Sequence, residues 1–217
     1  MNLYIVVEGL AEKKVFPSWI QILNPKLTQV FTLSEVLNNN YLIISGNGYP
    51  GYFDHIKDAV ATINSTKKFD KLIISIDSEE QTKQEKYEEV LDFLNDKPCD
   101  SEIHIIVQHF CLETWLLGNQ KVGPRNPKTK ELSAYKQFFN VLKEDPERLP
   151  DYPNENLNRA QFAFLYLKKM LKEKRMNYTK ASPKVVCHKS YFKEIKNRLD
   201  KTSHIESFSS FLEAFNF

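Results

Sequence analysis

Cysteine is scarce in this chain of 217 residues. Cys99, Cys111 and Cys187 lie far apart, and no two of them have the C-x-x-C spacing. An odd count without close spacing fits neither a disulfide framework nor a zinc signature. Reduced, unpaired thiols are typical of cytoplasmic proteins. We therefore expect a cytoplasmic location.

Long apolar runs, repeats and low-complexity tracts are also missing. No hydrophobic stretch approaches the roughly 18 residues that a membrane helix needs. The first eight residues read directly into an apolar strand, without the basic region and small-residue cleavage site of a signal peptide. These absences lead us to expect no association with a membrane.

Charge is nearly balanced overall, at +2, but it is unevenly distributed. Residues 77–100 hold nine acidic side chains against three lysines, whereas residues 159–201 hold thirteen Lys and Arg against three acidic residues. An acidic segment followed by a basic one fits a metal site beside a surface that binds a polyanion. Two solvated helix faces would give the same pattern.

Four compact apolar runs predict strands buried on both faces, at residues 3–7, 41–44, 71–76 and 103–107. Helical patterns follow the first three runs, at about 11–23, 51–63 and 80–94, and Pro17 is a possible bend in the first. Such alternation predicts an α/β fold with a mostly parallel, Rossmann-like central sheet flanked by helices.

The second half of the chain reads differently. Irregular stretches at 119–132 and 145–156 separate helical patterns at about 133–142, 158–174, 191–199 and 205–215. We therefore predict an α/β domain at residues 1–118 and a mainly helical, basic extension at residues 119–217, packed on that domain.

Carboxylates follow two of the predicted strands. Glu8 comes directly after the first strand, and Asp77 and Glu79 come after the third. In a parallel sheet, functional groups gather at the carboxyl ends of the strands. Converging carboxylates repel one another unless a cation neutralises them, and Mg²⁺ prefers oxygen ligands. The pattern predicts a site for Mg²⁺ or Mn²⁺ made by Glu8, Asp77 and Glu79.

Each acidic position also has a simpler interpretation. Acidic residues are common in the first turn of a helix, where the helix dipole favours them. Ser78 could cap a helix that starts directly after the third strand. The turn at 45–48, which contains Gly46 and Gly48, is a second feature of the first half and predicts unusual backbone dihedrals.

The combination of these motifs resembles the topoisomerase–primase (TOPRIM) domain family. The shared features are a strand that ends in Glu-Gly, a glycine-rich turn after a second strand, and a later strand that ends in an acidic pair. The resemblance implies that Glu8, Asp77 and Glu79 bind Mg²⁺. Glu79 departs from the family pattern, which usually has Asp at this position.

The segment at 108–117, which contains His109 and Glu113, resembles a segment of small stand-alone TOPRIM-like proteins that bacterial defence loci encode beside ATPases. The chain near Tyr178–Lys180 and at 205–212 resembles the tails of the same proteins. The resemblance implies a nuclease effector of anti-phage defence that works with an ATPase partner. Glu113 could be a metal ligand or a base, or it could cap a helix before Trp115.

Two functions from different classes follow. The first is a Mg²⁺-dependent nuclease in which Glu8, Asp77, Glu79 and Glu113 carry the chemistry and basic side chains hold DNA or RNA. The candidates for contacts with nucleic acid are Lys180, Lys184, His188 and Lys189. The alternative is a non-catalytic TOPRIM-fold module that binds nucleic acid or a partner protein, which the Glu79 departure favours.

Overall fold

The chain divides into two compact units in a computed structural model that describes residues 1–217. Unit 1 comprises Met1–Ile76, Lys83–Val107 and Ser210–Phe217. Unit 2 comprises Asp77–Thr82 and Gln108–Ser209. The chain therefore passes between the units after residues 76, 82, 107 and 209. The domain boundary at residue 118 that the sequence suggests stays a prediction.

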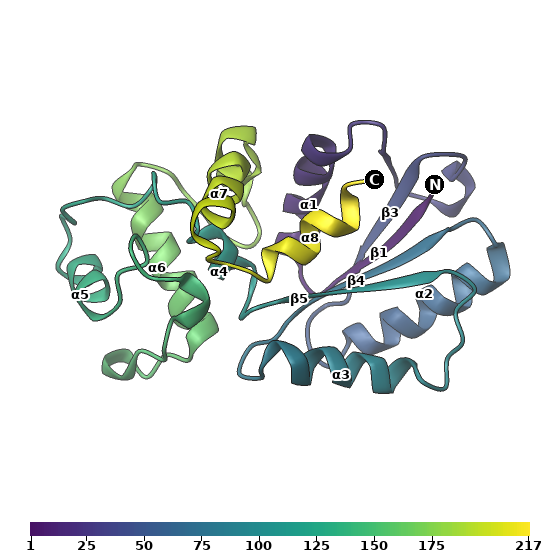
Figure 1. Ribbon diagram of the computed structural model, residues 1–217, viewed down its shortest axis with the longest axis horizontal. Coiled ribbons are helices and arrows are strands. Elements are labelled where there is room, and N and C mark those ends of the chain that lie inside the picture. Colours follow the sequence, from purple (N-terminus) through teal and green to yellow (C-terminus); the bar gives the residue numbers. More distant parts are fainter. The chain divides into compact units, whose positions relative to one another are not determined.

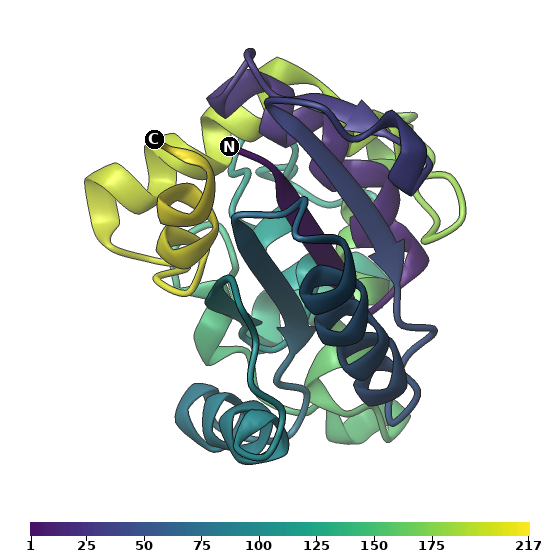
Figure 2. The same ribbon diagram turned by 90° about the vertical axis from the view of Figure 1, so that its right-hand side faces the viewer.

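A five-stranded parallel sheet forms the centre of unit 1, which confirms the predicted α/β fold. The strands are β1 (Leu3–Val7), β2 (Thr28–Val30), β3 (Asn40–Ser45), β4 (Lys71–Asp77) and β5 (Glu102–Gln108). Their order in the sheet is β2-β3-β1-β4-β5. Figure 2 shows β1, in purple, between β3 and β4. All four predicted strands belong to this one sheet.

The apolar runs form strands because the sheet is covered on both faces. Every residue of β1 is buried. The helices α2 (Tyr52–Thr66) and α3 (Lys83–Leu94) cover one face, and α1 (Leu10–Leu23) and α8 (Phe208–Phe215) cover the other (Figure 1). Pro17 lies inside α1, and the helix continues to Leu23. On that face, Phe211 of α8 packs against Phe16 and Trp19 of α1.

Two elements of unit 1 differ from the sequence expectation. The short edge strand β2 was not predicted, because three residues are too few to show an alternating pattern. The helix expected at 80–94 begins only at Lys83. Ser78 does not cap that helix, because its hydroxyl lies 2.8 Å from Nδ1 of His109.

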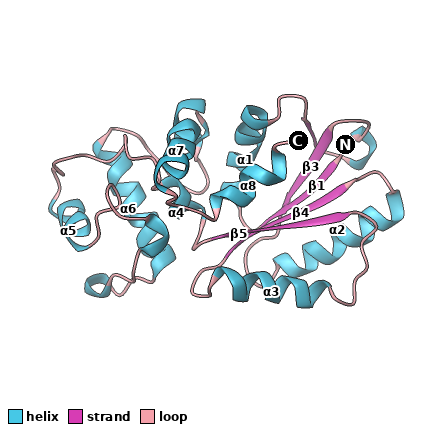
Figure 3. Cartoon of the chain, viewed as in Figure 1, coloured by secondary structure: helices cyan, strands magenta, loops and turns pink.

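Unit 2 contains helices and loops, and the strands of the sheet reach it only with their last residues (Figure 3). Its helices are α4 (Leu112–Leu116), α5 (Lys130–Phe138), α6 (Arg159–Glu173) and α7 (Lys189–Thr202). The helix expected at 133–142 is α5, which starts and ends earlier. Thr129 caps it by accepting a hydrogen bond from the Leu132 amide, and the backbone of Phe139 is extended.

Aromatic rings and one arginine hold unit 2 together. Tyr135 and Phe162 are buried and meet edge to face, with centroids 5.0 Å apart. Arg198 is 2% exposed and donates to the carbonyl oxygens of Val141 and Glu144, at 2.7 and 2.6 Å. These bonds satisfy carbonyls of the loop after α5. Burial lowers the pKa of Arg198 to about 10, so its side chain stays cationic at neutral pH.

None of the helices combines the length and the apolar character that crossing a membrane would require.

Candidate functional site

The turn after β4 carries two of the predicted site residues. Asp77 is the last residue of β4, and Glu79 follows in the turn that leads to α3. The backbone amides of Ser78 and Glu79 donate to the carbonyl oxygens of Gln108 and Phe110, at 2.9 Å each. The peptide bond that precedes Phe110 is cis. The turn is therefore fixed to the segment that follows β5.

Glu79 has a left-handed backbone conformation, with φ of 48°. This region is costly for a residue with a Cβ atom. Arg159, the first residue of α6, donates from Nη2 to the carbonyl oxygen of Glu79 at 3.2 Å, and its Nε lies 3.5 Å from a carboxylate oxygen of Glu80. The guanidinium also stacks on the Phe110 ring, 4.1 Å from its centroid. Arg159 thus holds the turn in its strained conformation.

A cavity of about 330 Å³ lies beside this turn within unit 2. The first turns of α6 form part of its wall, and the amino end of a helix favours anions. Carboxylates and a lysine line the same space. The lining residues are Asp77, Glu79, Cys111, Asn158, Ala160, Gln161, Phe164 and Lys180.

Glu113 contacts Lys180, one of the residues that line the cavity. It belongs to α4, its side chain is 1% exposed, and it accepts a hydrogen bond of 2.8 Å from the Tyr178 hydroxyl. Its other carboxylate oxygen lies 3.9 Å from the ammonium of Lys180. A buried carboxylate is stable only with such partners. Glu113 therefore ties Lys180 to the cavity and does not itself line it.

The thiol of Cys111 also faces the cavity. Burial raises its pKa well above the usual range, and the neighbouring charges of Glu113 and Asp77 add to the effect. The thiol is therefore protonated at neutral pH. A protonated thiol is a poor nucleophile and a poor ligand for a metal ion, which leaves the oxygen atoms as the chemically active groups.

Glu8 belongs to unit 1, where it follows β1 and is 8% exposed. The predicted glycine turn packs on its backbone, because the Gly48 amide donates to the Glu8 carbonyl at 3.0 Å. Gly48 has φ of 83°, as expected from its residue type. The strands β1 and β4 are parallel neighbours in register. Glu8 and Asp77 are therefore both at the carboxyl ends of adjacent strands.

Sequence reasoning missed Glu12, a second buried carboxylate near the end of β1. It lies in the first turn of α1 and is 4% exposed. A Cβ atom on Gly9 would lie only 2.9 Å from Oε2 of Glu12, so the carboxylate sits close against the backbone after β1. The signal in the sequence was its position four residues after Glu8, in the first turn of the helix that follows β1.

The predicted nucleic-acid contacts separate into two groups. Lys180 lines the carboxylate cavity, whereas His188 lines a different cavity of about 460 Å³ in unit 2, with Lys121 and Lys174. Lys184 and Lys189 are exposed and begin a 3-10 turn (Lys184–Cys187) and α7. The structure thus brings only Lys180 together with the carboxylates.

The donor set fits a hard cation. Asp77 and Glu79 offer oxygen atoms, which Mg²⁺ and Mn²⁺ prefer. No three His, Cys, Asp or Glu side chains are grouped closely enough to hold a metal ion by themselves. Gln108, the last residue of β5, is fully buried, and neither polar atom of its amide has a hydrogen-bond partner. Gln108 is not among the residues that line the cavity.

Comparisons with known proteins found no protein similar to this chain. No family model matches the chain, and neither the curated proteins nor the solved structures contain a match.

Proposed function

We propose that this protein is a Mg²⁺- or Mn²⁺-dependent nuclease that hydrolyses phosphodiester bonds in DNA or RNA. The observation that carries the proposal is the shared cavity of Asp77, Glu79 and Lys180. It combines oxygen donors for a cation with an ammonium group for a phosphate. Such a pairing suits phosphodiester cleavage, where the negative charge of the transition state must be stabilised.

Asp77 and Glu79 would hold the cation, and Glu8 is the third carboxylate that the sequence assigns to it. When bound, the cation polarises a phosphoryl oxygen and lowers the pKa of a water molecule. Lys180 binds a phosphate oxygen from the cavity wall. Arg159 keeps the Glu79 turn in place, and the amino end of α6 favours the negatively charged substrate.

Glu113 has a supporting role in this proposal. Its buried carboxylate contacts both Tyr178 and Lys180, and it lies outside the cavity lining. The Glu113 carboxylate, 3.9 Å from the Lys180 ammonium, orients that side chain. We therefore assign Glu113 as a residue that positions Lys180, in place of the ligand or base that the sequence suggested.

The TOPRIM resemblance extends the proposal to cellular context. The small stand-alone TOPRIM-like proteins that this chain resembles work as toxic effectors of anti-phage defence together with an ATPase. The same role for this chain, in the cytoplasm and with an ATPase partner, rests on its motifs alone.

A second candidate is a non-catalytic module that binds nucleic acid or a partner protein. Cationic side chains of the chain itself approach the acidic groups, since Arg159 lies 3.5 Å from Glu80 and Lys180 lies 3.9 Å from Glu113. Such internal neutralisation favours a site that works without a metal ion. Calorimetric titration with Mn²⁺ separates the two candidates, because only the nuclease requires binding that Asp77→Ala abolishes.

The test of the nuclease compares Glu8→Ala, Asp77→Ala and the double variant in cleavage of plasmid, single-stranded DNA and tRNA. Each assay is run with Mg²⁺, Mn²⁺ or EDTA, and also with an ATPase partner once one has been identified. We expect all three variants to lose activity to a similar degree, about 10²-fold or more, because residues that act as one unit are not additive. Full activity in either single variant places the chemistry elsewhere.

Glu79 provides the matched control. Glu79→Asp keeps the charge and restores the usual family residue, so it should retain substantial activity. Glu79→Gln keeps the size and removes the charge, so it should lose activity as Asp77→Ala does. Equal activities of the two variants would show that the charge at this position is not used.

A further inference from the structure

The two edges of the sheet in unit 1 differ in how well they are protected. The edge strand β2 has only three residues, which limits pairing with another chain. The opposite edge strand, β5, has seven residues, Glu102–Gln108, with the sequence EIHIIVQ. It contains no proline and no lysine, two residues that usually block edge pairing, and its one carboxylate, Glu102, lies at its first position. A long apolar edge of this kind is a template for a further strand.

The hydrogen bonds to β4 define which groups of β5 face outward. The Glu102 amide donates to the Asp70 carbonyl at 3.3 Å, and the Gln108 carbonyl accepts from the Ser78 amide at 2.9 Å. The even-numbered residues of β5 therefore pair with β4. In a parallel ladder the alternate residues direct their N–H and C=O groups to the other side. Those residues are Ile103, Ile105 and Val107.

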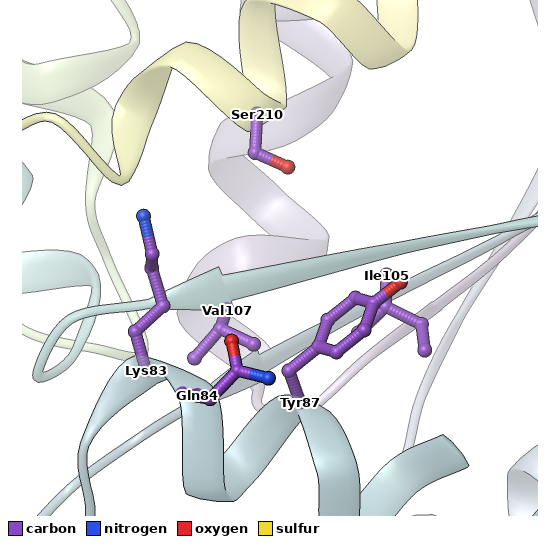
Figure 4. A pocket seen from close by; sticks show the side chains of 6 residues that line it. All are labelled: Lys83, Gln84, Tyr87, Ile105, Val107 and Ser210. Atoms are coloured by element: carbon purple, nitrogen blue, oxygen red, sulfur yellow. The ribbon is translucent and has the colours of Figure 1, made fainter.

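A hollow runs along this edge. A cavity of about 220 Å³ is bordered by Ile105 and Val107 of β5, by Lys83, Gln84 and Tyr87 of α3, and by Ser210 of α8 (Figure 4). Tyr87 is 38% exposed, and Leu91, one turn further along α3, is 43% exposed. Apolar side chains thus accompany the outward backbone groups, which gives an added strand both hydrogen bonds and a surface to bury.

We propose that a second copy of this chain binds here, with the two β5 strands antiparallel and centred on Ile105. In that register Ile105 faces its own copy, and Ile103 faces Val107 of the other copy. The three outward residues of each strand then exchange about six backbone hydrogen bonds, as alternate residues of an antiparallel pair do. The two sheets join into one, and the exposed stripes of α3 meet across the two-fold axis.

The ends of the edge carry complementary charges. Lys83 lies at the Val107 end of the hollow (Figure 4), and Glu102 begins the strand at the other end. An antiparallel arrangement brings Lys83 of each copy to the Glu102 end of the other. The antiparallel arrangement therefore forms the pair between Lys83 and Glu102 twice, once at each end of the interface. A parallel arrangement does not form these pairs. This self-complementarity is why a second copy fits better than an unrelated strand.

The first test measures the oligomeric state by analytical ultracentrifugation of the full chain, up to about 100 µM. We expect a reversible dimer that Leu91→Glu weakens at least about tenfold. Leu37→Glu is the matched control, because Leu37 is 83% exposed elsewhere in unit 1 and should leave the dimer unchanged. A wild-type chain that stays monomeric throughout this range overturns the proposal, as does a dimer that withstands Leu91→Glu.

The second test examines the register. Lys83→Glu and Glu102→Lys should each weaken the dimer, and the two together should restore it, because the charges are exchanged across the interface. Glu102 also pairs with Lys71, but it is 66% exposed, so losing that pair costs little in folding. Failure of the double variant to recover excludes the antiparallel register. Hydrogen exchange gives an independent readout, since the Ile103, Ile105 and Val107 amides should be protected only at dimer-forming concentrations.

Discussion

Glu79 combines an exposed side chain with a left-handed backbone. Glycine is the residue usually found in this conformation, because a Cβ atom is disfavoured at φ of 48°. Strained non-glycine residues cluster at functional sites, where the surrounding structure enforces them. Arg159 supplies that enforcement through the Glu79 carbonyl. The strain is consistent with a carboxylate that is kept for its chemistry at some expense of stability.

Replacing Glu79 separates stability from activity. Glu79→Gly relieves the left-handed strain, so we expect the free energy of unfolding to rise by about 0.5–1 kcal/mol. The same variant lacks the carboxylate and should be inactive in the cleavage assay. Glu79→Ala also lacks the carboxylate but keeps the Cβ atom, so it should be inactive without the gain in stability. Urea denaturation of the three proteins checks this, and an active glycine variant would contradict the role of the side chain.

Strand-end position, motif resemblance and charge pointed to single residues of the candidate site, and the roles of these residues stay predictions. Asp77, Glu79 and Lys180 were selected from strand-end position, motif resemblance and charge, and they line one cavity. The sequence did not indicate that Glu113 is buried against Tyr178, since that contact spans 65 residues. The left-handed conformation of Glu79 could not be predicted from the sequence either, because glutamate is not a residue type that favours it.

At the scale of elements, a buried network connects distant segments of unit 2. Glu147 belongs to a 3-10 turn, and its carboxylate contacts the hydroxyl of Ser207. The Ser207 hydroxyl also accepts a hydrogen bond of 2.7 Å from the Trp115 indole of α4. Burial raises the pKa of Glu147 to about 7, and the nearby charge of Asp145 adds to this, against the hydrogen bonds from Ser207. The network therefore titrates near neutral pH.

The raised pKa predicts that stability falls as pH rises. The folded state holds the Glu147 proton up to about pH 7, whereas the unfolded chain releases it near the usual glutamate pKa of 4.5. The stabilising contribution is complete below about pH 4.5 and is lost as pH rises through about 7, by on the order of 3 kcal/mol. Glu147→Gln stays neutral, so it should remove this dependence and be more stable than wild type at pH 8.

Denaturation of both proteins between pH 5 and pH 8, at about half-unit steps, gives the difference directly. Burial and the charge of Arg198 lower the pKa of His204, and this residue is present in both proteins. Parallel stability curves for the two proteins would show that Glu147 is ionised throughout.

Secondary structure was predictable where burial imposes a pattern. The four long strands were found because residues covered on both faces form continuous apolar runs. The strand β2 and the ends of α5 were not found, because a three-residue edge and a capping hydrogen bond from Thr129 leave little trace in hydrophobic periodicity. The turn before α3 was read as helix, because Ser78 has the residue type of a cap but bonds to His109 instead.

At the scale of the whole molecule, the charge distribution predicts how nucleic acid would bind. The thirteen basic residues between 159 and 201 all belong to unit 2, as does the carboxylate cavity. Each phosphate that a lysine or arginine neutralises releases counterions, so affinity for duplex DNA should fall at least about tenfold between about 50 and 200 mM salt. Fluorescence anisotropy with labelled DNA and RNA measures this, and an affinity independent of salt would exclude a phosphate-binding surface.

The matched variants are Lys180→Glu and Lys184→Glu, against Lys57→Glu, an exposed lysine of α2 in unit 1. The first two should weaken binding to all sequences alike and flatten the salt dependence, because they remove phosphate contacts. Lys57→Glu changes the net charge equally and should have little effect. Equal losses in all three variants would indicate attraction by net charge alone.

The return of the chain to unit 1 at Ser210 has a consequence for biosynthesis. Phe211 and Phe215 occupy the side of the sheet that Phe16 and Trp19 also cover, so the first unit to be translated lacks part of its core until residues 210–217 leave the ribosome. A nascent chain therefore exposes the apolar face of its finished strands while residues 108–209 of unit 2 are still being made. Removal of these eight residues should leave that face open and make the protein a substrate for chaperones and proteases, even though no cavity residue has been touched.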